Sequence, residues 1–209
     1  MKRSTIDWRI SKLTEQEILH RMSRGIYSVS KKEFEKFIPE INQTLKQLSG
    51  MVLKKFPFID ICVWSTKSIN EFMLHQPGKF YTILEVENDA MDAVFYELSS
   101  KRKDVFLNPT EEIINKYVIN AKEPIIITKL VTEAPTVKVG NVKTSTLEKM
   151  LVDIYSDPII YNTFQGAEMK RIYQNAFEKY HINKEGMLRY ANRRTKKEKI
   201  ETLIGRLEK

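Results

Sequence analysis

The sequence predicts a mixed α/β protein, in which a short N-terminal helix and hairpin precede an α/β sheet domain with a helical C-terminus. Between residues 58 and 128, short apolar runs of strand length alternate with amphipathic segments of helix length. From Thr144 onward, apolar positions recur at helical spacing. The composition, 42% apolar and 30% charged with 7 Gly and 7 Pro in 209 residues, excludes collagen-like, low-complexity and wholly disordered chains.

The first 36 residues form the N-terminal part of this prediction. Ser4 and Thr5 are favourable N-cap residues, and the apolar residues that follow recur at helical spacing, which predicts a helix over 5–16. A strand-like run over 18–22, a turn at 23–25 that contains Gly25 and a second extended run over 26–29 predict a hairpin.

Residues 37–209 form the predicted α/β domain. Pro39 suits the first turn of a helix that continues to about Phe56. We then expect strands at 58–64, 80–87, 105–107 and 124–128 that alternate with helices at 68–75, 89–100 and 109–118. Further helices are expected at 144–156, 166–180, 184–193 and 195–207.

The net charge of +8 lies at the two ends of the chain. Residues 1–36 carry nine Lys and Arg against five Asp and Glu, and residues 184–209 carry nine against four. The C-terminal excess is typical of a solvated helical face, with a nonspecific nucleic-acid patch as the alternative. The N-terminal excess, on a helix and hairpin, favours nucleic acid as a partner.

Metal, cofactor and membrane chemistry have little support in the sequence. One cysteine, Cys62, cannot form an intramolecular disulfide, and the start MKRSTIDWRI has no apolar segment of a signal peptide. The three histidines, His20, His75 and His181, lie far apart, and no glycine-rich phosphate loop or nucleophile motif occurs. We therefore expect a cytoplasmic protein with no cofactor, no metal and no membrane contact.

The N-terminal helix and hairpin supply side chains of the kinds that contact DNA. Lys and Arg bind phosphates, Arg also reads base edges, and small polar groups support both kinds of contact. The predicted DNA-binding residues are Thr5, Trp8, Arg9 and Lys12 on the helix and His20, Arg21 and Arg24 on the hairpin. The alternative is a solvated helix face beside an ordinary hairpin.

Three carboxylates support a rival, enzymatic interpretation. Asp60 lies on the first predicted sheet strand, and Glu85 and Glu87 end the next, as in metal-dependent nucleases that pair an acid with a Glu-x-Lys motif. Here Glu87 occupies the lysine position, so the motif is degenerate. We therefore favour the interpretation that these carboxylates are solvated or cap the ends of strands and helices. The second functional hypothesis is thus a divergent metal-dependent nuclease or nucleotidyltransferase-like enzyme. The third is a protein-interaction module without catalytic activity.

The segment STIDWRISKLTEQEILHRMSRGIYSV resembles the recognition helix and wing of a winged helix-turn-helix in AbiEi-type antitoxins. The wing matches at Arg24-Gly25-Ile26-Tyr27, whereas the link over 14–17 lacks the glycine common in that family. The resemblance implies a bacterial type IV toxin–antitoxin (abortive-infection) regulator. Its winged helix would bind its own promoter, and its C-terminal domain would oppose a nucleotidyltransferase-like toxin without needing a stable complex.

One departure from that family concerns the winged helix itself. It needs two helices before the recognition helix, and only three residues precede Ser4. We expect that either the native chain starts upstream of Met1 or the DNA-binding unit is incomplete. Residues 4–16 should then pack on the C-terminal domain or on a second protomer, as a homo-oligomer, because a short isolated helix is marginal in water. This chain alone should bind operator DNA weakly, and nanomolar binding in a gel shift would contradict that expectation.

Overall fold

The computed structural model describes residues 3–16, 18–23, 25–29 and 36–207, and it divides into two compact units. Unit 1 spans residues 1–35 and unit 2 spans residues 36–209. The boundary expected from the sequence, between residues 36 and 37, lies one residue away. Each unit is described by itself.

The described residues of unit 1 form one helix and one two-stranded sheet. Helix α1 spans Arg3–Glu15, and strands β1 (His20–Ser23) and β2 (Ile26–Ser28) pair antiparallel. Gly25 between the strands has a φ of 81°, in the left-handed region that glycine adopts without a steric penalty. The expected helix and hairpin are therefore both present.

Unit 2 contains a four-stranded sheet with the strand order β3-β4-β6-β5. The first pair is antiparallel, and the other two pairs are parallel. The strands are β3 (Ile61–Ser65), β4 (Thr82–Val86), β5 (Val105–Leu107) and β6 (Ile125–Lys129). The run Ile125-Ile126-Ile127 is buried because strand residues alternate between faces and both faces of the central strands are covered.

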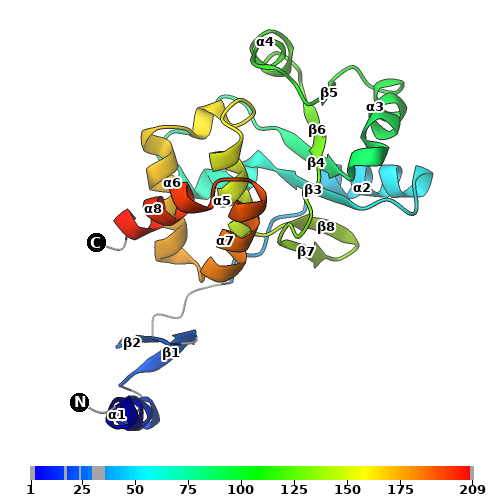
Figure 1. Cartoon of the computed structure of the whole chain (residues 1–209). Helices are drawn as coiled ribbons and strands as arrows, with labels where there is room; N and C mark the ends of the chain where they lie inside the picture. Colours follow the sequence, from blue (N-terminus) through cyan, green and yellow to red (C-terminus); the bar gives the residue numbers. More distant parts are fainter. Residues whose placement is uncertain (1–2, 17, 24, 30–35, 208–209) are drawn as a thin grey trace. The chain divides into compact units, whose positions relative to one another are not determined.

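Helices cover both faces of this sheet (Figure 1). Helices α2 (Gln43–Lys55) and α3 (Met91–Ser99) pack on one face, where Leu84 and Ile127 belong to one apolar cluster. Ile83 and Ile126 belong to a second cluster with the C-terminal helices on the other face. These are α5 (Leu147–Ser156), α6 (Ala167–Lys179), α7 (Lys184–Arg193) and α8 (Lys197–Leu207). The mixed α/β fold with a helical C-terminus is thereby confirmed.

Short helical segments connect these elements. They are the 3-10 helices η1 (Thr66–Phe72), η2 (Asn88–Ala90) and η4 (Asn162–Phe164), and the short helix α4 (Glu111–Ile113), which continues as the π-helical turn η3 (Ile114–Val118). The segment predicted as a helix at 68–75 is thus a 3-10 helix at 66–72. Pro39 opens no helix, because α2 begins after Asn42, whose side chain accepts a hydrogen bond from Leu45 N at 2.9 Å.

A second hairpin precedes α5 and was not expected from the sequence. Strands β7 (Thr136–Val139) and β8 (Val142–Ser145) pair antiparallel around Gly140, which has a φ of 59°. Residues 144 and 145, predicted as the start of a helix, belong to β8, and Thr146 is the N-cap of α5. No helix in the described part of the chain has the length and apolar character needed to cross a bilayer.

Candidate functional site

Helix α1 carries four of the predicted DNA-binding residues on one face. Thr5, Trp8, Arg9 and Lys12 fall within a sector of about 100° because an α-helix has 3.6 residues per turn. All four are exposed, and the ring of Trp8 lies 5.1 Å from Lys12 Nζ, as a cation–π contact. We call these four residues the basic face of α1.

The hairpin holds the other three predicted residues in different surroundings. His20 is half-buried and pairs with Ser28 across the strands, whereas Arg21 pairs with Tyr27 and is exposed. Arg24 lies outside the described residues. The chain turns from α1 into β1 where the backbone N–H groups of residues 18 and 19 both donate to Leu13 O at 3.0 Å.

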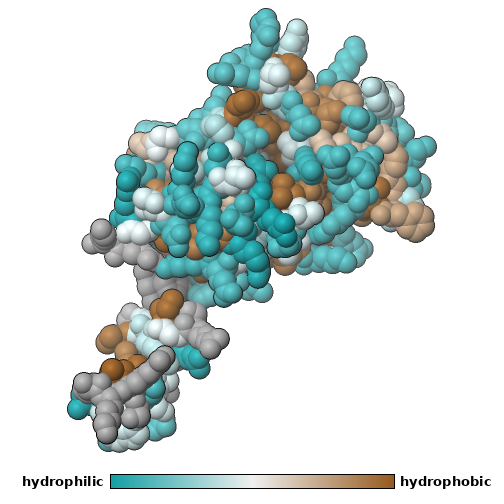
Figure 2. Space-filling view, viewed as in Figure 1, coloured by the Kyte–Doolittle hydropathy of each residue, from teal (hydrophilic) through white to brown (hydrophobic). Residues whose placement is uncertain are grey.

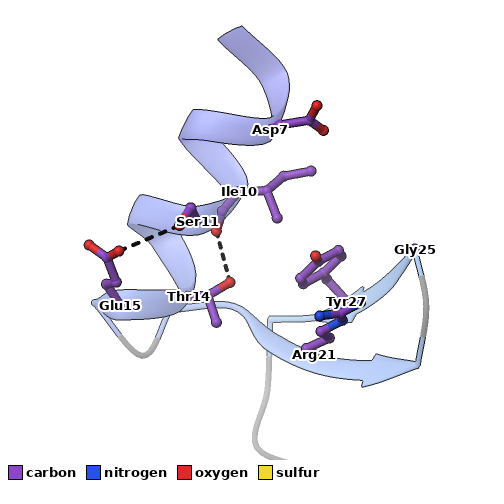
Figure 3. A pocket seen from close by; sticks show the side chains of 8 residues that line it. All are labelled: Asp7, Ile10, Ser11, Thr14, Glu15, Arg21, Gly25 and Tyr27. Carbon is purple, nitrogen blue, oxygen red and sulfur yellow. Dashed lines mark hydrogen bonds between the residues drawn. The ribbon is translucent and has the colours of Figure 1, made fainter. Parts of the chain in front are cut away.

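A groove of about 470 Å³ lies between α1 and the hairpin (Figure 3). Eight residues line it, among them Asp7, Ile10 and Thr14 of α1 and Arg21 and Tyr27 of the hairpin. The helical positions that line the groove point to the side of α1 largely opposite the basic face. Unit 1 therefore has two distinct surfaces, and Arg21 belongs to the groove.

Unit 2 contains a cluster of buried charges that was not predicted from the sequence. Lys149 Nζ donates to Glu85 Oε2 at 2.6 Å and to Asp153 Oδ2 at 2.5 Å. The hydroxyl of Tyr190 donates to Asp153 Oδ1 at 2.7 Å, and Arg194 Nε lies 3.9 Å from that oxygen. Strand β4 supplies Glu85, helix α5 supplies the lysine and Asp153, and α7 supplies the tyrosine. We call these five residues the buried charge cluster.

The electrostatics of this cluster favour fixed charges over reactivity. Burial alone would lower the pKa of Lys149, but Asp153 and Glu85 more than offset burial and raise that pKa well above its ordinary value. Burial also raises the pKa of Cys62, the neighbour of Glu85 across β3 and β4, so the thiol stays protonated. Lys149 has no exposed surface, and Glu85 and Asp153 are 3% and 2% exposed. These three charged groups are therefore closed to a substrate from solution.

Two of the three carboxylates of the enzymatic alternative form ion pairs with different lysines. Asp60 forms an ion pair with Lys143 at 2.7 Å, while Glu85 is bound to Lys149. Glu87 precedes η2, and its backbone N–H donates to Asp60 O at 3.1 Å. Among the residues that the structure describes, no three His, Cys, Asp or Glu side chains are placed to hold a metal ion. The geometry that this alternative requires is thus not found for Asp60, Glu85 and Glu87.

The sequence contained one signal of the buried charge cluster. Lys149 and Asp153 are spaced four apart within the apolar stretch LEKMLVDIYS, so both fall on the buried side of an amphipathic helix. Charged side chains on the apolar side of a helix are seldom buried without a partner of opposite charge. The partner, Glu85, lies 64 residues away, and no local pattern identifies it.

Comparison with known proteins gives one match. Residues 5–209 match the DUF6577 model, described as a family of unknown function, and this match includes both the basic face of α1 and the buried charge cluster. Searches of curated proteins and of solved structures returned no significant match. The chain therefore belongs to the DUF6577 family.

Proposed function

We propose that this protein is a DNA-binding transcriptional regulator, and that it acts as the antitoxin of a type IV toxin–antitoxin system. The observation that carries the DNA-binding part is the basic face of α1, which is exposed and directly precedes a hairpin. A helix followed by a hairpin is the order of a recognition helix and its wing.

The dimensions and chemistry of the basic face suit the major groove of DNA. An α-helix with its side chains is about 10–12 Å wide, and the major groove is about 12 Å wide. Arg9 and Lys12 are suited to phosphates or to the acceptor atoms of guanine, and Thr5 to a supporting hydrogen bond. Trp8 lies against Lys12 and supplies an apolar surface for sugar or base contact.

The antitoxin part of the proposal rests on the resemblance of the sequence to AbiEi-type antitoxins. We infer from it a cytoplasmic protein that binds its own promoter and opposes a nucleotidyltransferase-like toxin encoded beside it. Co-expression tests this part: the adjacent gene should arrest growth when expressed alone, and this protein should restore growth. If the adjacent gene is not toxic, the antitoxin role is contradicted. That result does not bear on DNA binding, which is tested separately.

DNA binding is tested by fluorescence anisotropy with a duplex from the promoter of the protein's own gene. We expect the double variant Arg9→Glu/Lys12→Glu to bind at least about tenfold more weakly at low salt. We also expect the slope of log K against log salt to fall by about 2, since each lost phosphate contact contributes about 0.9. Low salt is appropriate because we expect weak binding by this chain.

The matched control is Lys46→Glu/Lys54→Glu, on the exposed side of α2 in unit 2. It changes the net charge by the same amount and leaves α1 intact. Binding within about twofold of the wild type is expected, because these lysines lie outside the proposed interface. An equal loss of DNA affinity in both variants would show that binding depends only on net charge. Unchanged binding by the α1 variant would refute the proposed interface.

A further inference from the structure

The end of α7 and the start of α8 form a corner with many basic side chains. Residues 189–199 contain six Lys and Arg and a single acidic residue, Glu198. We call five of these basic residues the basic corner: Arg189, Arg193, Arg194, Lys196 and Lys197. None of the five is buried, and Figure 2 shows mainly hydrophilic side chains over α7 and α8. The corner is therefore accessible to a partner from solution.

Two members of the basic corner have acidic partners. Arg193 forms an ion pair with Glu133 in which both side chains are about half exposed, and Arg194 forms one with the buried Asp153. An exposed ion pair contributes little because water and salt screen it, and a guanidinium group has five N–H donors. Arg193 therefore retains donors for a second anion.

The other three members of the basic corner are less well neutralised. Arg189, Lys196 and Lys197 form no ion pair with any residue that the structure describes, although Glu133 lies within electrostatic reach of Arg189. The carboxylates that offset the charge of the corner are Asp153, Glu133 and Glu198. The corner thus carries more positive than negative charge, which favours a polyanion as its partner.

Arg194 has a hydrogen-bonding capacity that the fold does not use. Its side chain is only 22% exposed, and its Nε lies 3.9 Å from Asp153 Oδ1, which is too far for a hydrogen bond. The guanidinium group donates no hydrogen bond to any residue in the described part of the chain. Polar groups that are largely buried are nearly always hydrogen-bonded, so these donors require water or an anion from outside the chain.

The backbone holds the basic corner in a defined geometry. The N–H groups of Thr195 and Lys196 donate to Asn192 O at 3.0 Å and to Ala191 O at 2.9 Å, and Thr195 has a φ of 56°. The last turn of α7 is also fixed by Tyr190, whose hydroxyl group belongs to the buried charge cluster. A ligand at the corner would therefore order side chains without ordering the backbone, which lowers the entropic cost of binding.

We propose that the basic corner is a second DNA contact, which binds the phosphate backbone without reading the base sequence. Lys and Arg side chains bind phosphates, and the planar fork of Arg194 is suited to two phosphate oxygens at once. The choice of DNA over another polyanion rests on the proposed function, since α1 would bring a duplex to the same chain. The corner adds affinity without base contacts, so sequence recognition stays with the basic face of α1.

The test uses the full chain in fluorescence anisotropy at low salt, with the promoter duplex and with a scrambled duplex of equal length and composition. The variant Lys196→Glu/Lys197→Glu should bind both duplexes at least about tenfold more weakly than the wild type. The slope of log K against log salt should fall by about 2, since each lost phosphate contact contributes about 0.9. The ratio of promoter to scrambled affinity should stay within about twofold of the wild-type ratio, because no base contact is lost.

Two controls accompany this variant. Lys46→Glu/Lys54→Glu changes the net charge by the same amount on α2, and it should bind both duplexes within about twofold of the wild type. The melting temperature of Lys196→Glu/Lys197→Glu should lie within about 2 °C of the wild type, because neither lysine is buried. A loss of DNA affinity in this variant is then not a loss of folding.

Failure of this proposal differs from failure of the proposed function. If Lys196→Glu/Lys197→Glu loses no more affinity than the α2 control, or loses affinity for the promoter duplex alone, the basic corner is not a backbone contact. The same conclusion follows if the wild type does not bind the scrambled duplex at low salt. If instead the Arg9→Glu/Lys12→Glu variant binds the promoter as the wild type does, the proposed function fails while the corner is still supported by its own variant.

Vesicles of phosphatidylcholine and phosphatidylserine distinguish DNA from an anionic membrane as the partner. We expect no difference between the wild type and Lys196→Glu/Lys197→Glu in sedimentation with these vesicles. Vesicle binding that this variant loses, together with unchanged DNA binding, would assign the corner to a membrane surface and overturn the proposal.

Discussion

The two units of this chain differ in where their charge and their apolar surface lie. Unit 2 buries apolar side chains on both faces of its sheet and even encloses Lys149, Glu85 and Asp153. In the described residues of unit 1, nothing is buried, and both its basic face and its groove are accessible. Unit 2 is therefore stabilised by a core of its own, whereas the basic face of unit 1 is exposed and is the surface that we propose binds DNA.

The largest expected loss of stability follows from replacing the lysine of the buried charge cluster. Lys149→Met leaves Glu85 and Asp153 buried without their counter-charge, which should lower the free energy of unfolding by about 3–5 kcal/mol. Urea denaturation followed by circular dichroism measures this loss. The control is the triple variant Glu85→Leu/Lys149→Met/Asp153→Leu, which strands none of these three charges and should lose less. A loss under about 1 kcal/mol for Lys149→Met would mean that water reaches the cluster.

Apolar truncation compares the two units directly. Ile83→Ala in the sheet of unit 2, where Ile83 has no exposed surface, should cost about 2–5 kcal/mol. Ile10→Ala in the groove of unit 1 should change the unfolding of unit 2 by less than about 0.5 kcal/mol. A Trp8→Phe background leaves the buried Trp64 as the single tryptophan, so fluorescence reports unit 2 alone. Equal losses for the two alanine variants would show that the units unfold together.

Alkaline pH should weaken unit 2 through Lys149. Its pKa is raised above the ordinary value of 10.5, so the folded state keeps this proton after the unfolded state has lost it. The stabilisation is complete below about pH 10.5 and is lost as the pH rises through the folded-state pKa. The melting temperature of the wild type should fall above that pH by more than that of the triple apolar variant. Parallel curves would contradict a paired, charged Lys149.

The smallest expected effect concerns divalent metals. Magnesium at millimolar concentration, or its removal by EDTA, should change the melting temperature of unit 2 by no more than about 1 °C. The reason is that the described residues contain no group of three side chains placed to hold a metal ion. A metal bound at such a site would raise the melting temperature by stabilising the folded state. A clear rise with magnesium that disappears in Glu87→Gln would instead support the enzymatic alternative. A rise that is unaffected by changes at Asp60, Glu85 and Glu87 would point to a different site.

Local patterns predicted most of the fold. The strand at 105–107 and the helix at 184–193 occur with the expected bounds, because each is set by short-range periodicity and by turn residues at its ends. The hairpin of β7 and β8 was not predicted because its strands are only four residues long and partly polar, although Gly140-Asn141 is a pair typical of hairpin turns.

The sites were harder to predict because they depend on residues that are distant in sequence. Spacing along α1 is sufficient to place Thr5, Trp8, Arg9 and Lys12 on one face. The groove depends on how the hairpin folds back on the helix, and the buried charge cluster joins β4, α5 and α7. Sequence reasoning grouped Glu85 with Asp60 and Glu87, whereas their ion-pair partners come from α5 for Glu85 and β8 for Asp60.

Hydrogen exchange with and without promoter DNA tests the central claim, that recognition resides in unit 1 and stability in unit 2. Without DNA, the amides of β4 and β6 should exchange far more slowly than those of α1, because only the former belong to a closed core. With DNA, slower exchange should appear in α1 and be lost in the Arg9→Glu/Lys12→Glu variant. DNA-dependent protection confined to α5–α8, with none in α1, would contradict the account.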